Sequence, residues 1–172
     1  TYAESTKRRQ DAPALPKPRL RGWLHAGWAP LLQVLGLILL VATPTLIGRI
    51  GVAIYLVSAT ILFGMSAVYH RGNWSDRVAA WLRRLDHSNI FLLIAGTYTP
   101  LSLVLLQGAD RIVILSVIWG IAALGITFKM FWMSAPRWLY TGLYLAMGWV
   151  ALWWLVPLAR AGGPVILTLI IV

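Results

Sequence analysis

Four polar residues, Ser66, His70, Asp86 and His87, interrupt a sequence that is otherwise strongly apolar. Ser66 and His70 lie four residues apart at the end of one apolar run, and Asp86 and His87 precede the next run. Residues at positions i and i+4 share one face of a helix. Ionisable groups at membrane depth are energetically costly, so they usually face the interior of a bundle and mark a functional site. These residues therefore predict a polar site between the second and third apolar segments.

Each side chain has both a chemical and a structural interpretation. A neutral imidazole such as that of His70 is a common zinc ligand, whereas a lone histidine near a helix end is more often an interfacial residue. Asp86 is suited to orienting a water molecule or accepting its proton. It is equally suited to stabilising a helix N-terminus beside Arg83 or Arg84. Ser66 can bond to the carbonyl of the preceding turn. The residue types alone leave both interpretations open.

Two further histidines are weaker candidates. His87 follows Asp86 directly, so on a helix it points about 100° away from that carboxylate. His25, near the start of the first apolar run, is a third candidate ligand that its spacing does not require. One histidine and one aspartate do not complete a catalytic zinc site, which usually has three protein ligands and a water molecule.

Apolar stretches of transmembrane length must position this site. Hydrophobic residues make up 59% of the 172 residues and charged residues 12%, well below the quarter typical of soluble domains. A spanning helix needs about 20 apolar residues. Five stretches approach this length: Trp28–Ile47, Ile50–Tyr69, Asn89–Leu106, Ile112–Met133 and Trp138–Pro157. A sixth stretch of nine residues begins at Pro164 and is too short to cross a bilayer.

The expected fold is therefore all-α, a polytopic transmembrane helix bundle of five complete spans and a partial sixth. Residues 1–22 mix charges and prolines without periodicity and are predicted to be a disordered, basic cytoplasmic tail before the bundle of residues 23–172. Glycines in the segment Ile47–Gly51 predict a tight turn there. Pro44 is expected to kink the end of the first span, and Pro100 to kink the third.

The segment Arg71–Asp86 differs from the other connections. Its apolar residues recur at helical spacing with arginines between them, and Ser75 is suited to cap the start of a helix. We expect a short amphipathic helix that lies in the membrane interface.

The distribution of charge predicts the orientation. If the N-terminus and the second and fourth loops share one side, that side holds twelve of the fifteen lysines and arginines. The positive-inside rule then places the N-terminus in the cytoplasm, with the protein in the plasma or inner membrane. The net charge of +10 is thus a topology signal and not a sign of nucleic-acid binding. Membrane lipid is the expected partner, and the sequence does not define an oligomeric state.

Three segments in order resemble the hemolysin III family: SAVYH at 66–70, RLDH at 84–87 and AGTYTP at 95–100. The segment PRLRGWLH at 18–25 is also similar to the beginning of that family's first helix, and the resemblance extends from residue 18 to residue 172. The family belongs with the progestin and adiponectin receptor group of seven-helix membrane proteins and is similar to alkaline ceramidases.

This resemblance implies a zinc site. In the family, a histidine of the second helix binds zinc together with two histidines of a His-x-x-x-His pair on the seventh helix, and the first of these roles maps onto His70. Asp86 maps onto the residue that holds the zinc-bound water, and Ser66 onto a supporting polar residue. The seventh helix is absent from this sequence, so we expect a C-terminal truncation and a complete zinc site in the full-length protein.

The activity implied by the resemblance is zinc-dependent hydrolysis of a lipid amide or ester. The expected catalytic residues are Asp86, which orients the zinc-bound water or takes its proton, and Ser66 in a supporting polar role. Two alternatives remain: a membrane-perturbing, hemolytic protein and a receptor-like protein without catalytic activity.

Overall fold

The computed structural model describes residues 19–132, 136–154, 156, 157, 160, 162, 163 and 168. These residues form five α-helices and no strand, which confirms the predicted all-α fold. The helices are α2 (Arg19–Ala42), α3 (Leu46–Arg71), α4 (Asp76–Leu105), α5 (Gly108–Phe131) and α6 (Arg137–Trp153).

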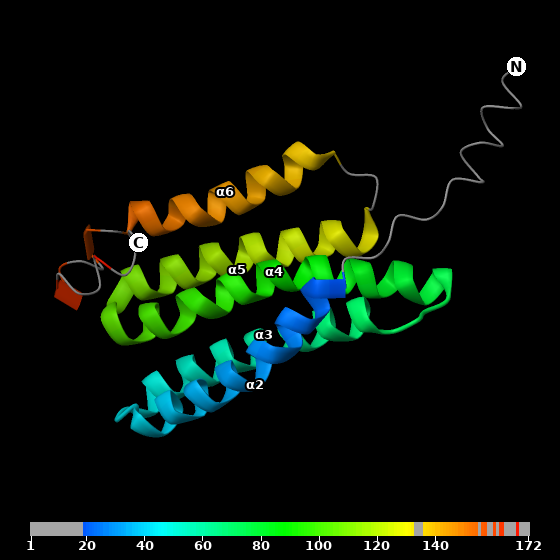
Figure 1. Cartoon of the computed structure of the whole chain (residues 1–172). Coiled ribbons are helices and arrows are strands. Elements are labelled where there is room, and N and C mark those ends of the chain that lie inside the picture. Colours follow the sequence, from blue (N-terminus) through cyan, green and yellow to red (C-terminus); the bar gives the residue numbers. More distant parts are fainter. Residues whose placement is uncertain are drawn as a thin grey trace, which may run out of the picture.

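Consecutive helices pack as antiparallel neighbours joined by short connections (Figure 1). α3 packs against both α2 and α4, α5 packs against α4, and α6 packs against α5. The end of α3 and the start of α4 therefore lie at the same end of the bundle, as the predicted site requires. α2 starts at Arg19, so the helix overlaps the last residues of the predicted tail, and residues 1–18 lie outside the described part of the chain.

α3 and α4 approach closely because small residues occupy their interface. A methyl group added at Gly51 would lie 2.7 Å from the Cα atom of Pro100, and one added at Gly96 would lie 2.5 Å from the Oγ atom of Ser58. Both glycines are buried. The lack of a Cβ atom thus allows the two backbones to meet, as small residues commonly do between membrane helices.

The main apolar core lies between α4, α5 and α6. The Phe91 ring of α4 packs onto Gly125 of α5, where a methyl group would meet it at 2.5 Å. The same ring stacks on Tyr144 of α6, with the two centroids 4.3 Å apart. The Tyr98 hydroxyl donates to the carbonyl of Met147 on α6 over 2.6 Å. α4 is therefore the helix around which the others are arranged.

The predicted interfacial helix is not a separate element. Residues 76–105 form one continuous helix of 30 residues, so the amphipathic segment extends the third span. No proline or glycine occurs between Asp76 and Ala95 to end a helix, and both halves carry helical periodicity. Ser75 is the N-cap residue, as predicted, but its side chain makes no capping hydrogen bond. The helix continues past Pro100.

The predicted turn at Ile47–Gly51 is wrong. These residues are the first turns of α3, and the chain reverses earlier, at Thr43–Thr45. The Thr45 hydroxyl accepts a hydrogen bond from the backbone N–H of Gly48 over 3.2 Å, which caps the new helix. Pro44 accordingly stands between two helices and does not kink a single one.

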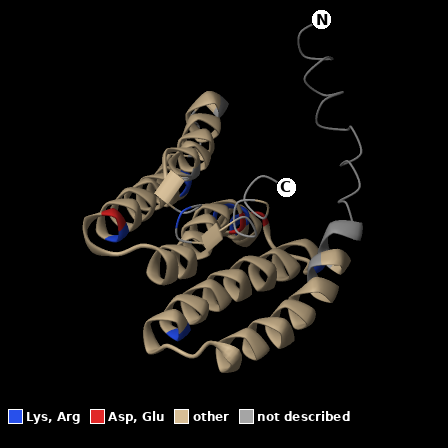
Figure 2. Cartoon of the chain, turned by 90° about the vertical axis from the view of Figure 1, so that its left-hand side faces the viewer, with Lys and Arg blue, Asp and Glu red and all other residues tan. Residues whose placement is uncertain are grey.

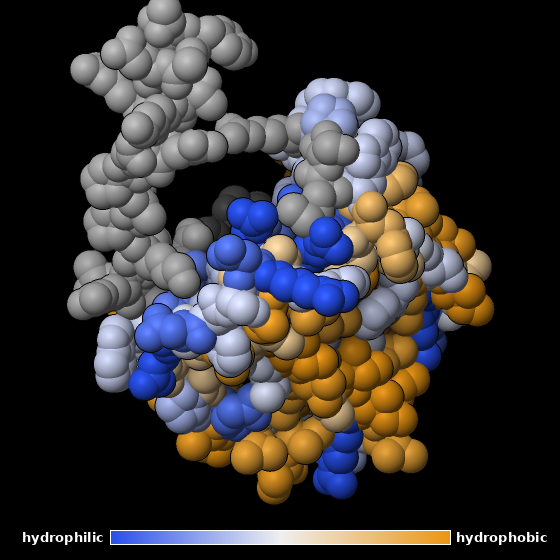
Figure 3. Space-filling view, turned by 90° about the vertical axis from the view of Figure 1, so that its right-hand side faces the viewer, coloured by the Kyte–Doolittle hydropathy of each residue, from blue (hydrophilic) through white to orange (hydrophobic). Residues whose placement is uncertain are grey.

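Three helices, α3, α4 and α5, are long and apolar enough to cross a membrane. α2 carries a shorter apolar segment, Ala26–Ala42, and α6 has 17 residues. Large apolar side chains such as Val41, Leu46 and Trp153 are more than 70% exposed. Apolar residues cover the sides of the bundle and hydrophilic ones gather at the end that holds the α3–α4 connection (Figure 3). The opposite end carries fewer charges in the part of the chain that the structure describes (Figure 2).

Gly51 provides a direct test of the α3–α4 contact. Gly51→Ala forces a methyl group onto the backbone of Pro100, so we expect the free energy of unfolding to fall by about 1–3 kcal/mol. Gly64→Ala is the matched control on the same helix, because a methyl group at Gly64 meets nothing within 4 Å. Unfolding in mixed detergent micelles measures both variants. Equal stability of the two would show that α3 and α4 do not meet at Gly51.

Candidate functional site

His70 and Asp86 face each other across the α3–α4 interface. The Nε2 atom of His70 lies 4.0 Å from the Oδ2 atom of Asp86, and the two side chains are 12% and 13% exposed. His70 belongs to the last turn of α3, and Asp86 lies ten residues after the first residue of α4. The two residues whose proximity the topology predicted are thus brought together by the structure.

The antiparallel register of the two helices sets this pairing. From the far end of the interface toward the site, Gly51 meets Pro100 and Ser58 meets Gly96. Next, the Asn89 amide donates to the carbonyl of Ile61 over 3.5 Å. His70 and Asp86 form the last step of the same series. The close contacts between small residues therefore determine which carboxylate the imidazole meets.

The short connection between α3 and α4 closes this end of the site. The backbone N–H of Gly72 and the indole N–H of Trp74 both donate to the carbonyl of Val68, over 3.1 Å each. The Arg71 guanidinium lies 4.4 Å from the ring centroid of Trp23 on α2. These contacts hold the last turn of α3, and with it His70, against its neighbours.

The other predicted residues occupy different environments. Ser66 is buried, 2% exposed, one turn before His70 on α3. His87 is exposed, in keeping with its expected direction away from Asp86. The side chain of His25 lies outside the described part of the structure. Of the two predicted α3 residues, His70 faces Asp86, and Ser66 is buried one turn away on the same helix.

Two buried polar residues near the site were missed by the sequence analysis. Ser88 and Asn89 follow Asp86 and are 2% and 7% exposed. The Ser88 hydroxyl donates to the carbonyl of Arg84 over 2.7 Å, within its own helix. Asn89 was treated as the start of an apolar span, although an amide within such a span is itself a signal for an interhelical contact.

Arg84 links the site to α5. Its Nη1 atom donates to the carbonyl of Met130 over 3.5 Å, and its guanidinium lies 4.9 Å from the Trp81 ring centroid. A cation at the last carbonyls of α5 is favourable because those carbonyls carry partial negative charge. The sequence analysis had offered Arg84 as a partner for Asp86.

The His70 and Asp86 pair fits part of a zinc site. Two atoms bound to one tetrahedral zinc ion lie about 3.4 Å apart, given bond lengths near 2.1 Å. The observed 4.0 Å between Nε2 of His70 and Oδ2 of Asp86 is longer than this separation. Among the described residues, no group of three histidine or acidic side chains could hold a metal ion. Further ligands would have to come from other parts of the protein.

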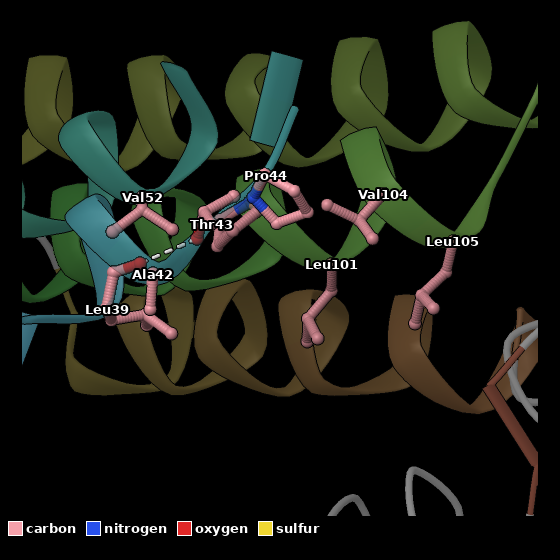
Figure 4. A pocket seen from close by; sticks show the side chains of 9 residues that line it. Leu39, Ala42, Thr43, Pro44, Val52, Leu101, Val104 and Leu105 are labelled. Carbon is pink, nitrogen blue, oxygen red and sulfur yellow. Dashed lines mark hydrogen bonds between the residues drawn. The ribbon is translucent and has the colours of Figure 1, made fainter. Parts of the chain in front are cut away.

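A pocket lies at the opposite end of the bundle from His70. It has a volume of 410 Å³ and is formed by the last turn of α2, the turn that follows, Val52 of α3 and the end of α4 (Figure 4). Its lining is almost entirely aliphatic and carries no titratable side chain. This pocket is therefore separate from the polar site.

Comparisons with known proteins identify the family to which this chain is similar. The family model for haemolysin-III related proteins matches residues 14–171. Hemolysin-3 from Bacillus cereus is 34% identical over 146 residues, which cover 83% of this chain and 66% of that protein. A Hemolysin-3 homolog from Bacillus subtilis (strain 168) is 45% identical over 69 residues, 40% of this chain and 32% of that protein. The chain thus spans less than two thirds of the length of these curated relatives.

The proximity of His70 and Asp86 can be measured as an interaction energy. In a double-mutant cycle of His70→Ala and Asp86→Asn, we expect a coupling free energy of about 0.5–3 kcal/mol, as for residues in contact. The cycle is measured by unfolding in micelles that contain a chelator, so that bound metal does not contribute. A cycle of His70→Ala with Asp76→Asn is the control, because Asp76 lies ten residues earlier on the same helix. Equal coupling in the two cycles would contradict the observed geometry.

Proposed function

Because this chain belongs to the haemolysin-III related family, we propose that the protein is a membrane-embedded, zinc-dependent hydrolase that acts on a lipid amide or ester. The observation that carries the proposal is the pairing of His70 with Asp86 between two helices that can span a membrane. An imidazole and a carboxylate that are largely buried between such helices indicate a functional site, because either group alone is energetically costly in lipid.

The residues of this chain supply only part of the chemistry. His70 would hold zinc through Nε2, with the remaining ligands supplied by parts of the protein beyond the described residues. When bound, zinc lowers the pKa of water to about 7 and polarises a substrate carbonyl. The Asp86 carboxylate, 4.0 Å from Nε2, would orient a water molecule and accept its proton. Ser66, buried one turn deeper, supports the polar wall of the site.

The position of the site favours a lipid substrate. His70 belongs to the last turn of α3, next to Asp86 and at the end of the bundle that holds the α3–α4 connection. Hydrophilic residues gather at this end (Figure 3). A lipid amide or ester bond lies at the same depth, between the headgroup and the acyl chain. Such a bond can reach the site from within the bilayer, whereas a water-soluble ester would have to partition there first.

The proposal is tested on the whole protein, expressed from the source gene and reconstituted in lipid nanodiscs. We expect bound zinc and cleavage of an acyl amide or ester, with ceramide and phospholipid as the first substrates. His70→Ala should remove zinc and activity together. Asp86→Asn should keep the fold and lower the rate at least about 100-fold, because proton transfer is lost. His87→Ala, a change at the exposed neighbour, is the matched control and should keep both zinc and rate.

Zinc-loaded protein that cleaves neither lipid class above the His70→Ala background would refute hydrolysis. The names of both relatives favour membrane lysis as a second candidate function. Release of haemoglobin from erythrocytes by the same variants separates the two. Lysis that is unchanged in His70→Ala would assign it to a surface other than the polar site.

We also propose that the N-terminus and the α3–α4 connection face the cytoplasm of the cell. Basic side chains support this orientation, because Arg71, Arg77, Arg83, Arg84 and Lys129 all belong to the end of the bundle that contains the site. A green fluorescent protein fused after Asn73 should therefore fluoresce, and alkaline phosphatase fused after Gln107 should be active. The reverse pattern would place the polar site on the outer side of the membrane.

A further inference from the structure

A second apolar hollow lies at the end of the bundle opposite His70, and an arginine side chain forms part of its lining. It has a volume of 470 Å³ and opens between the last turn of α2 and the first turns of α3. Four apolar residues and one arginine line it: Leu40, Val41, Arg49, Ile50 and Ala53. An apolar hollow with a charge beside it is suited to an amphipathic ligand.

The Arg49 side chain is held at this place by the backbone. Its Nε atom donates to the carbonyl of Thr43 over 2.8 Å, just beyond the last residue of α2. A guanidinium has five N–H donors, so this bond leaves four for another acceptor. Arg49 is exposed, and among the described residues no carboxylate lies within 4.0 Å of it. The positive charge therefore lacks a counter-charge from this part of the protein.

The bilayer itself supplies the missing acceptor. Arg49 lies at the end of a helix that can span the membrane, where phosphates of the lipid headgroups are found. A guanidinium matches a phosphate because its parallel N–H groups can bind two oxygens at once. The adjoining aliphatic lining can cover an acyl chain. We propose that an anionic phospholipid binds here, with its phosphate on Arg49 and an acyl chain in the hollow beside α2.

Arg111 and the hollow in Figure 4 lie at the same end of the bundle, but each has only one of the two properties found at Arg49. Arg111 makes the same kind of bond, from Nε to the carbonyl of Leu106 over 2.7 Å, but it lines neither this hollow nor the one in Figure 4. The hollow in Figure 4 is aliphatic but has no charged residue in its lining. Arg49 combines the two properties that a phospholipid needs.

The test uses the whole protein in nanodiscs of phosphatidylcholine with a minor fraction of phosphatidylglycerol. Native mass spectrometry after release from the nanodisc counts the lipids that stay bound. We expect retained phosphatidylglycerol, lowered about fivefold by Arg49→Gln through loss of one surface charge. Arg111→Gln is the matched control and should retain it. Ala53→Leu, which fills the hollow, should also release the lipid, whereas Ala42→Leu in the other hollow should not.

Three results would overturn the proposal. The first is equal loss of lipid in Arg49→Gln and Arg111→Gln, which would indicate general attraction of charges. The second is retention of phosphatidylcholine equal to that of phosphatidylglycerol. The third is full displacement of the lipid by glycerophosphoglycerol at matched concentration, which would indicate a site for the phosphate but none for the acyl chain. Arg49→Lys keeps the positive charge but cannot bind two phosphate oxygens with parallel N–H groups, so it should retain an intermediate amount of phosphatidylglycerol. None of these results depends on the proposed hydrolysis.

Discussion

The close contact between α3 and α4 is the feature on which the other arrangements depend. Gly51 and Gly96 let the two backbones meet, and the antiparallel register that follows brings His70 opposite Asp86. A larger residue at either glycine would push the two helices apart and so disturb the contact of His70 with Asp86. The same helix α4 then carries Phe91 and Tyr98 to the other half of the bundle, so one interface positions both the polar site and the apolar core.

Several hydroxyl groups of the described helices donate a hydrogen bond within their own helix. The side chains of Ser58, Thr60, Ser88, Thr97, Thr99 and Thr127 each donate to the carbonyl four residues earlier, over 2.7–2.8 Å. A bilayer offers no water for such groups, so bonding within the helix is the simplest solution. An ionised carboxylate has no donor to offer its own helix, and Asp86 instead faces the imidazole of His70 across the interface.

Much of the fold and half of the site were predictable from the sequence. The lengths of the apolar stretches predicted the helices. Because consecutive helices run in opposite directions, the sequence also predicted that His70 and Asp86 meet. The misplaced turn has a physical reason, because Gly48 and Gly51 are buried and serve close packing, whereas Pro44 and Thr45 form the reversal. Periodicity alone also could not show that α4 is continuous, since an amphipathic and an apolar segment share the same helical period. The contact of Asn89 with Ile61 needed the register, which only the packed structure gives.

The two arginine bonds at the end opposite the site have a consequence for biogenesis. Arg49 binds the carbonyl of Thr43, and Arg111 binds that of Leu106, so each closes the reversal between the two helices that flank it. Both closures use residues within a few positions of the reversal. Each pair of helices, α2 with α3 and α4 with α5, can therefore complete its tip during synthesis, before the following pair emerges from the ribosome. Each of these two hairpins would then enter the lipid with one carbonyl at its reversal already bound by an arginine.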